Sequence, residues 1–172
     1  IWDRGVIDRP SRHFLGVVGA ASGGPPLLPD ADLVLLLGAR IDYRVGYGEP
    51  PAMPPGATLV RIDLDPDELR QGRDPDLAIQ ADPASALVAL TGAVAGLAGF
   101  APKRAWLAEA RRRLADFRRP WSGTPPAAPP ITGRHLVEAV RACLSDETVL
   151  LIDGGNIGQW AHALADRYPR HW

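Results

Sequence analysis

This sequence has a single cysteine and almost no net charge. Its 172 residues include one cysteine, Cys143, so no internal disulfide can form and no cysteine-based metal site is available. The formal net charge is −1, which favours neither nucleic acid nor a membrane surface as a partner. The longest apolar runs, such as residues 33–37, are far shorter than the roughly 20 residues that span a bilayer. We therefore expect a cytoplasmic, reducing environment, with no nucleic acid or membrane as a partner.

Glycine and proline are abundant, with 18 of each. Together they stay below the roughly 25–30% at which chains become structureless. A hydrophobic content of 46% and a charged content of 23% are typical of a folded globular chain. The sequence therefore predicts a globular protein that is rich in loops.

The first hundred residues follow an α/β pattern. Residues 33–37 and 59–63 are runs bounded by turn residues, which predicts parallel strands buried on both faces, and residues 77–79 are a weaker third strand. Asp82 is a good N-cap with a proline after it, so a helix is predicted over residues 84–97.

The remaining residues predict three helices, a linker and one strand. Residues 103–119 predict an amphipathic helix whose outer face has a local charge of +5. Five prolines in residues 120–130 mark a semi-rigid linker. Beyond it we expect a helix at residues 136–144, a strand at 149–152 and a helix at 160–168. Cys143 lies on the apolar stripe of its helix, which predicts core packing.

The arginines of the basic helix allow two interpretations, nucleic-acid contact or a solvated or intersubunit face. The absence of interleaved aromatic residues favours the second. The four histidines show no metal-ligand spacing, and His135 and Glu138 share a helical face that is typical of surface pairing.

Two candidate ligand positions follow predicted strands. Asp63 ends the second strand, where an acidic residue commonly binds a ribose hydroxyl, although a structural turn carboxylate explains it equally well. Arg40 and Arg44 follow the first strand and are suited to a phosphate or, equally, to an ion pair with Asp42 or a neighbour. Asp65 predicts an N-cap for a helix that starts at the next residue, a proline.

Two glycine-rich segments are further candidates. Residues 16–24 form an ordinary loop or a ligand loop, with the wrong spacing for a dinucleotide fingerprint. Asp153, Gly154, Gly155 and Asn156 lie between a predicted strand and a helix, which suits a diphosphate because the helix offers free N–H groups. A plain strand-to-helix turn remains the alternative.

Four motifs in order resemble the thiamine diphosphate-dependent enzymes of the acetolactate synthase and 2-hydroxyacyl-CoA lyase superfamily. They are residues 16–19, 30–44, 59–69 and 81–82, followed by residues 131–172 with the loop 153–156. The resemblance implies a Rossmann-like parallel-sheet middle domain at residues 1–100, truncated at its N-terminus. A helix and proline-rich linker would follow at 101–130, then the truncated start of a second α/β domain, the pyrophosphate-binding domain, at 131–172.

Site residues follow from the same resemblance. Gly154, Gly155 and Asn156 would approach thiamine diphosphate, and Arg40, Asp63 and Asp82 would bind FAD or ADP, which some members hold in the middle domain. The activating glutamate and the Gly-Asp-Gly motif that binds Mg²⁺ would lie outside these residues, so no catalytic or metal-binding residue is expected here.

The implied activity is C–C bond cleavage or formation on a 2-oxo acid or 2-hydroxyacyl-CoA by a full-length homodimer or homotetramer. The segment alone is expected to be inactive. A non-catalytic FAD- or ADP-binding regulatory module of the same sheet fold is the alternative.

Overall fold

A computed structural model describes residues 11–16, 24–99, 103–123, 125, 127, 130–153 and 155–164. The chain divides into two compact units. Pro26–Arg104 form the sheet unit, and Ile1–Pro25 together with Ala105–Trp172 form the helical unit. The α/β class is confirmed, whereas the predicted domain boundaries at residues 100 and 130 stay predictions.

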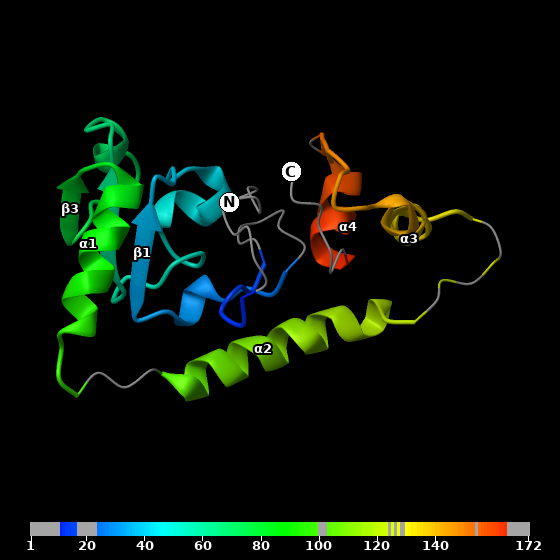
Figure 1. Cartoon of the computed structure of the whole chain (residues 1–172), viewed down its shortest axis with the longest axis horizontal. Coiled ribbons are helices and arrows are strands. Elements are labelled where there is room, and N and C mark those ends of the chain that lie inside the picture. The colour runs from blue at the N-terminus through cyan, green and yellow to red at the C-terminus, as the bar shows by residue number, and fades with distance from the viewer. Residues whose placement is uncertain are drawn as a thin grey trace. The chain divides into compact units, whose positions relative to one another are not determined.

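Three parallel strands form the sheet of the first unit. They are β1 (Leu33–Leu37), β2 (Thr58–Asp63) and β3 (Leu77–Gln80), hydrogen-bonded in the order β1-β2-β3. Helix α1 (Pro83–Ala95) follows β3 (Figure 1). Each strand lies within one residue of its predicted range, because the apolar runs end at strong turn signals.

The prediction that both apolar runs form strands buried on both faces is wrong for residues 33–37. Leu59 and Ile62 of β2 are buried, but Leu33 of β1 is 57% exposed and every residue of β3 is exposed. The faces of a sheet are buried by helices or loops packed on them, and α1 has no buried residue.

The loops of the sheet unit are compact. They contain the short 3₁₀ helices η2 (Leu28–Asp30), η3 (Tyr43–Gly48) and η4 (Glu68–Arg70). The Arg73 guanidinium donates hydrogen bonds to the carbonyl oxygens of Pro54 (2.9 Å), Pro55 (3.1 Å) and Ala57 (2.6 Å). It therefore joins the loop after η4 to the chain that enters β2.

The prediction of a helix that starts after Asp65 is wrong. The Asp65 carboxylate instead accepts the N–H of Asp67 at 2.9 Å, and only the three-residue η4 follows. An aspartate of this kind caps a local turn as readily as a helix, so the sequence signal was ambiguous.

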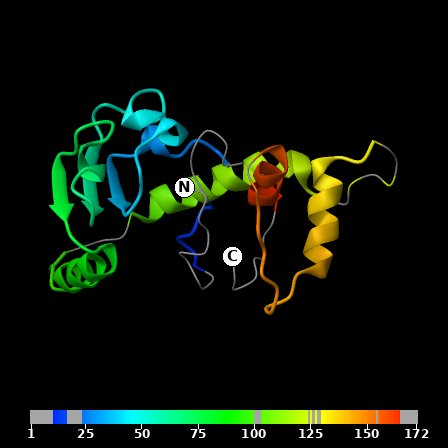
Figure 2. The ribbon, with the colours of Figure 1, turned by 90° about the horizontal axis from the view of Figure 1, so that it is seen from above.

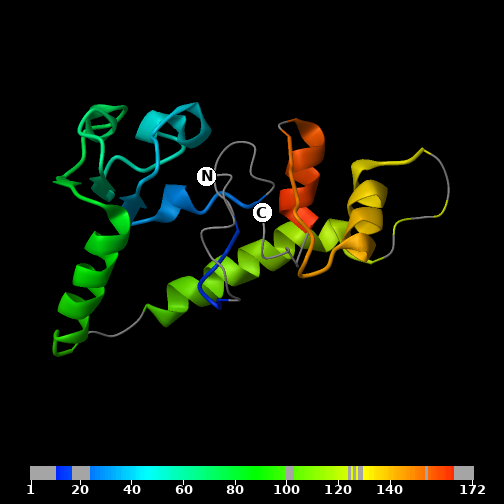
Figure 3. The same cartoon turned by 45° about the horizontal axis from the view of Figure 1, so that its top comes forward.

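The helical unit contains α2 (Arg104–Arg118), whose first residue falls in the sheet unit, and then η5 (Arg119–Trp121), α3 (Gly133–Cys143) and α4 (Asn156–Leu164). Val137 and Ala163 are buried together, with Phe117, Trp160 and Ala161 packed against them. Figures 2 and 3 show the chain after α3 turning back to reach α4.

Two predictions for this unit need correction. Residues 149–152 do not form a ladder strand in the described part of the chain, where only Val149 makes an isolated β-bridge. Apolar β-branched residues favour an extended chain, but a ladder also needs a neighbouring strand. Helix α4 begins at Asn156 rather than at residue 160, and residues 165–168 lie outside the described residues.

No helix among the described residues combines the length and apolar character that crossing a membrane requires.

Candidate functional site

Arg40, Asp63 and Asp82 lie at one edge of the sheet. Arg40 follows β1, Asp63 ends β2 and Asp82 follows β3. Because both strand pairs are parallel, these three positions share the carboxyl edge, where open α/β sheets commonly bind ligands. The structure thus brings the three predicted nucleotide-binding residues to the same side of the sheet unit.

Each of these three side chains already has an intramolecular partner. Arg40 Nε lies 3.0 Å from Glu68 Oε1, and Asp63 Oδ1 accepts the backbone N–H of Asp65 at 3.0 Å. Asp82 Oδ2 accepts the N–H of Ser85 at 2.8 Å and its hydroxyl at 2.7 Å. Arg40 nevertheless stays accessible to an anion, because its side chain is 72% exposed.

Asp82 has the structural role that its sequence position predicts, at the N-cap of α1. The hydrogen bond from the Ser85 hydroxyl, and then the one from the Ser85 backbone N–H, lower the pKa of Asp82 below its ordinary value. A charged carboxylate at this position also suits the positive end of the helix dipole. The same carboxylate is therefore engaged before any ligand is considered.

Arg44 forms the ion pair with Asp42 that the sequence offered as an alternative to phosphate binding. Its Nε donates to Asp42 Oδ2 at 2.9 Å, and its backbone N–H donates to Asp42 Oδ1 at 2.9 Å. The side-chain hydrogen bond from Arg44 lowers the pKa of Asp42 and raises that of Arg44. Of the two arginines after β1, Arg40 is thus the one with the more exposed guanidinium.

The second candidate region is the start of α4. Asn156 is the first residue of the helix and is exposed, and Gly155 precedes it with φ of 108°. A Cβ built on Gly155 would meet no atom within 4 Å, so open space lies in front of this backbone. Gly154 lies outside the described residues.

This region fits a diphosphate by its donor chemistry. The first-turn N–H groups of a helix lack intrahelical acceptors, and the helix dipole favours an anion there. A glycine with positive φ allows a ligand to approach the backbone where a side chain would stand in the way. The residues present therefore have the donor chemistry to hold a diphosphate group.

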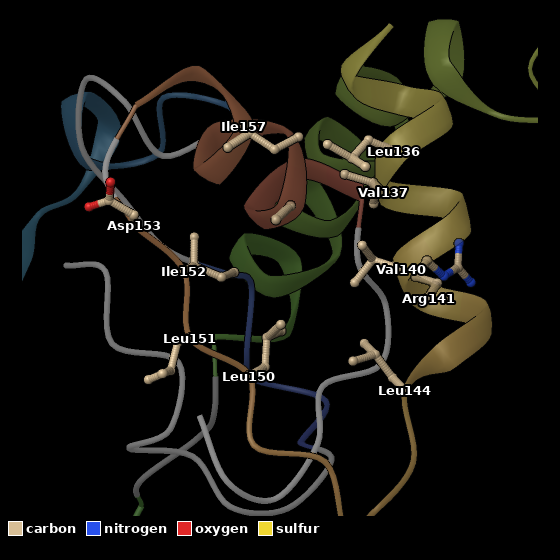
Figure 4. A pocket seen from close by; sticks show the side chains of 11 residues that line it. Leu136, Val137, Val140, Arg141, Leu144, Leu150, Leu151, Ile152, Asp153 and Ile157 are labelled. Atoms are coloured by element: carbon tan, nitrogen blue, oxygen red, sulfur yellow. The ribbon is translucent and has the colours of Figure 1, made fainter. Parts of the chain in front are cut away.

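An apolar cavity of about 210 Å³ lies behind this region, between α3, residues 150–153 and α4. Figure 4 shows Leu136, Val137 and Val140 of α3 facing the cavity, with Ile157 of α4 above it. Leu151, which is 87% exposed, points away from α3. Asp153 lines the cavity at its end near Gly155.

Three arginines of the basic segment are paired with the two acidic residues of α2. Arg112 pairs with Glu109 (2.8 Å) and Asp116 (2.6 Å), and Arg113 pairs with Glu109 at 2.9 Å. Arg119 lies 3.1 Å from Asp116. These contacts hold Arg112, Arg113 and Arg119 against the surface of the helix, which is compatible with a solvated face.

Two smaller predictions are wrong. Cys143 is exposed rather than packed in the core, because it is the last residue of α3. His135 does not pair with Glu138: its Nδ1 accepts the N–H of Thr132 at 3.0 Å, and Glu138 pairs with Arg141 at 3.2 Å. Among the described residues, no group of three His, Cys, Asp or Glu side chains is placed to hold a metal ion.

Sequence reasoning missed the burial of Arg61. This β2 side chain is 1% exposed, and its Nη1 donates to the Gln71 carbonyl oxygen at 2.6 Å, while Nε and Nη2 have no hydrogen-bond partner among the described residues. Burial lowers the pKa of Arg61, whereas the nearby charges of Glu68 and Asp63 raise it. Its position beside Leu59 and Ile62 in a buried strand was the available signal.

The family described as "Thiamine pyrophosphate enzyme, central domain" matches residues 2–90, which confirms the resemblance seen in the motifs. The chain therefore belongs to the thiamine pyrophosphate enzymes.

Three relatives extend this comparison. The chain is 32% identical over 164 residues to the acetolactate synthase isozyme 1 large subunit of Escherichia coli, covering 94% of the chain and 27% of that protein. It is 28% identical over 155 residues to human 2-hydroxyacyl-CoA lyase 2, covering 84% of the chain and 23% of the lyase. Sulfoacetaldehyde acetyltransferase of Rhodobacter capsulatus is 30% identical over 187 residues, covering 93% of the chain and 30% of that protein. The chain thus spans between a fifth and a third of the length of these relatives.

Proposed function

We propose that the loop 153–156 and the first turn of α4 bind the diphosphate of thiamine diphosphate. The observation that carries this proposal is the open space in front of Gly155, whose φ is 108°, directly before the free N–H groups of α4. Membership of the thiamine pyrophosphate enzymes supplies the identity of the ligand.

The whole protein would act on a 2-oxo acid or a 2-hydroxyacyl-CoA by C–C bond cleavage or formation. The names of the relatives in Escherichia coli and human support this substrate class. When bound, thiamine diphosphate would supply nucleophilic and electron-accepting chemistry for C–C bond cleavage or formation, while the protein binds and orients it. The residues of this chain would contribute binding at the phosphate end.

Further parts of the proposal concern the whole protein. Mg²⁺ would accompany the diphosphate. A homodimer or homotetramer and a cytoplasmic location complete the proposal, and the single cysteine is compatible with that location. No turnover is expected from residues 1–172 alone.

A nucleotide at the sheet edge has weaker support. The shared edge of Arg40, Asp63 and Asp82 favours an ADP or FAD site, but each side chain is engaged within the chain. Binding would require Arg40 to exchange Glu68 for a phosphate. No observation favours a regulatory module that lacks catalysis over the thiamine diphosphate assignment.

Isothermal titration calorimetry of the chain with thiamine diphosphate and Mg²⁺ tests the main proposal. We expect saturable binding that Gly155→Val weakens, because a β-branched residue is strained at positive φ and its side chain fills the open space. Gly92→Ala is the control, since a Cβ at Gly92 meets nothing within 4 Å. Absence of binding by the unaltered chain, or equal binding by Gly155→Val, would contradict the proposal.

A further inference from the structure

Trp160 connects the candidate diphosphate site to the rest of the helical unit. It lies on α4 four residues after Asn156, so the two residues share one face of the helix. The indole packs against the buried pair Val137 and Ala163, and it is itself partly buried. A movement of this ring relative to α3 would therefore move the first turn of α4.

The Trp160 ring lies directly on Gly133, the first residue of α3. A Cβ built on Gly133 would lie 2.4 Å from Cδ1 and 2.7 Å from Cγ of Trp160. Carbon atoms in van der Waals contact stay about 3.5–4.0 Å apart. The position therefore admits glycine alone while Trp160 keeps its present place.

A second contact holds the ring from the linker side. Trp121 of η5 meets Trp160 edge-on, with ring centroids 4.9 Å apart and an interplanar angle of 88°. Edge-to-face pairs of this kind add to the packing energy and fix ring orientation. The residues after Trp121 are hydrogen-bonded to α3, because Arg134 Nη2 donates to the carbonyl oxygens of Ser122 (3.0 Å) and Gly123.

From these contacts we propose that Trp160, seated on Gly133 and held by Trp121, is a positioning residue for the diphosphate site. It fixes the position of α4 relative to α3 and η5, and so places the N–H groups of the first turn for the ligand. The proposal rests on the proposed function of the loop 153–156. It adds that the affinity of this site depends on a packing contact one helical turn away.

The test uses the whole chain and magnesium pyrophosphate as the probe, measured by isothermal titration calorimetry. Gly133→Ala places a methyl group 2.4 Å from Cδ1 of the Trp160 ring, so the ring must move. We expect the affinity for pyrophosphate to fall about tenfold, within the usual range for a coupled packing change. The amide NMR signals of Gly155 and Asn156 should shift in this variant before ligand is added. Gly92→Ala is the matched control and should leave both readouts unchanged.

Rescue separates positioning from general damage to the fold. Gly133→Ala combined with Trp160→Leu makes room for the methyl group, so affinity should return to within about twofold of the unaltered chain. If Gly133→Ala leaves no folded chain by circular dichroism, Trp160→Ala and Trp160→Phe replace it. Trp160→Ala should then weaken binding, and the conservative Trp160→Phe should retain most of it.

Each outcome decides between the proposals. Unchanged pyrophosphate affinity in a folded Gly133→Ala or Trp160→Ala chain overturns the positioning role and leaves the proposed function intact. Failure of the double variant to recover pyrophosphate affinity would also overturn the positioning role and leave the proposed function intact. Absence of pyrophosphate binding by the unaltered chain overturns the proposed function, and the positioning role with it.

Discussion

The sheet unit and the helical unit differ in what fixes their structure. The sheet unit buries Met53 and Leu59 completely and encloses the charged Arg61, and Arg73 ties its loops together. The helical unit has a smaller buried set and leaves an apolar cavity of about 210 Å³ beside α3. One unit is held by buried contacts between segments distant in sequence, and the other by helix packing and surface ion pairs.

This difference bears on the two candidate sites. At the sheet edge, Arg40, Asp63 and Asp82 are all engaged in contacts that maintain the loops. At the start of α4, Gly155 faces open space. A ligand at the sheet edge must therefore displace existing contacts, whereas a diphosphate at α4 adds contacts without breaking any that the structure shows for Gly155.

The largest expected effect tests the burial contrast between the units. Leu59→Ala removes a side chain with 0% exposure and should lower the free energy of unfolding by about 2–5 kcal/mol. Leu151→Ala, at 87% exposure, should change it by less than about 0.5 kcal/mol. Urea denaturation followed by circular dichroism measures both.

Tryptophan fluorescence localises the effect of Leu59→Ala. Trp106, Trp121 and Trp160, the tryptophans among the described residues, lie in the helical unit, so their emission reports on that unit. The circular dichroism transition should move to lower urea without an equal shift in emission. Equal losses for Leu59→Ala and Leu151→Ala would remove the contrast between the units.

A second prediction concerns the loops of the sheet unit. Gly72 has φ of 70°, and a Cβ there would lie 2.3 Å from Ile41 Cγ2 and 2.9 Å from the Tyr47 oxygen. Gly72→Ala should cost about 1–3 kcal/mol from backbone strain alone. Gly56→Ala is the control, since its Cβ meets nothing within 4 Å. A thermal melt in which both variants unfold together would show that the loop is not tightly packed.

Much of the sheet unit could be predicted because its signals are local. The runs at β1 and β2 end at turn residues, and Asp82 followed by a proline is a strong N-cap signal. The carboxyl edge shared by Arg40 and Asp63 follows from parallel strands. These features need no knowledge of residues distant in sequence.

The features that escaped prediction depend on distant partners. Arg61 is buried because Gln71 and the loop around it fold over β2, which no local pattern encodes. Residues 149–152 have the composition of a strand but form no ladder in the described part of the chain. The contact between Gly133 and Trp160 joins residues 27 positions apart, and only the structure shows that the glycine is required.

The third prediction asks whether Asp82 serves the fold or a ligand. Asp82→Ala removes the acceptor for both Ser85 hydrogen bonds, so the Tm of the sheet unit should fall, whereas Asp82→Asn should retain most of the cap. The lowered pKa of Asp82 means that this stabilisation is present above its unfolded-state pKa and is lost as pH falls through the folded-state value. Equal Tm values for Asp82→Ala and the unaltered chain at pH 7 would contradict the capping role.

The smallest expected effect concerns the surface ion pairs of α2. Hydrogen bonds from Arg112 and then Arg113 lower the pKa of Glu109 from 4.5 to about 2. Because the folded-state pKa is lowered, the stabilisation is fully present above pH 4.5 and disappears as pH falls toward 2. Glu109→Gln should therefore lower the Tm followed by tryptophan emission slightly at pH 7, and this difference should close near pH 2. High salt at pH 7 should also reduce it, because exposed pairs are screened. A Tm difference that changes with neither pH nor salt would show that Glu109 acts through packing. The helical unit would then resemble the sheet unit more closely than its contacts indicate.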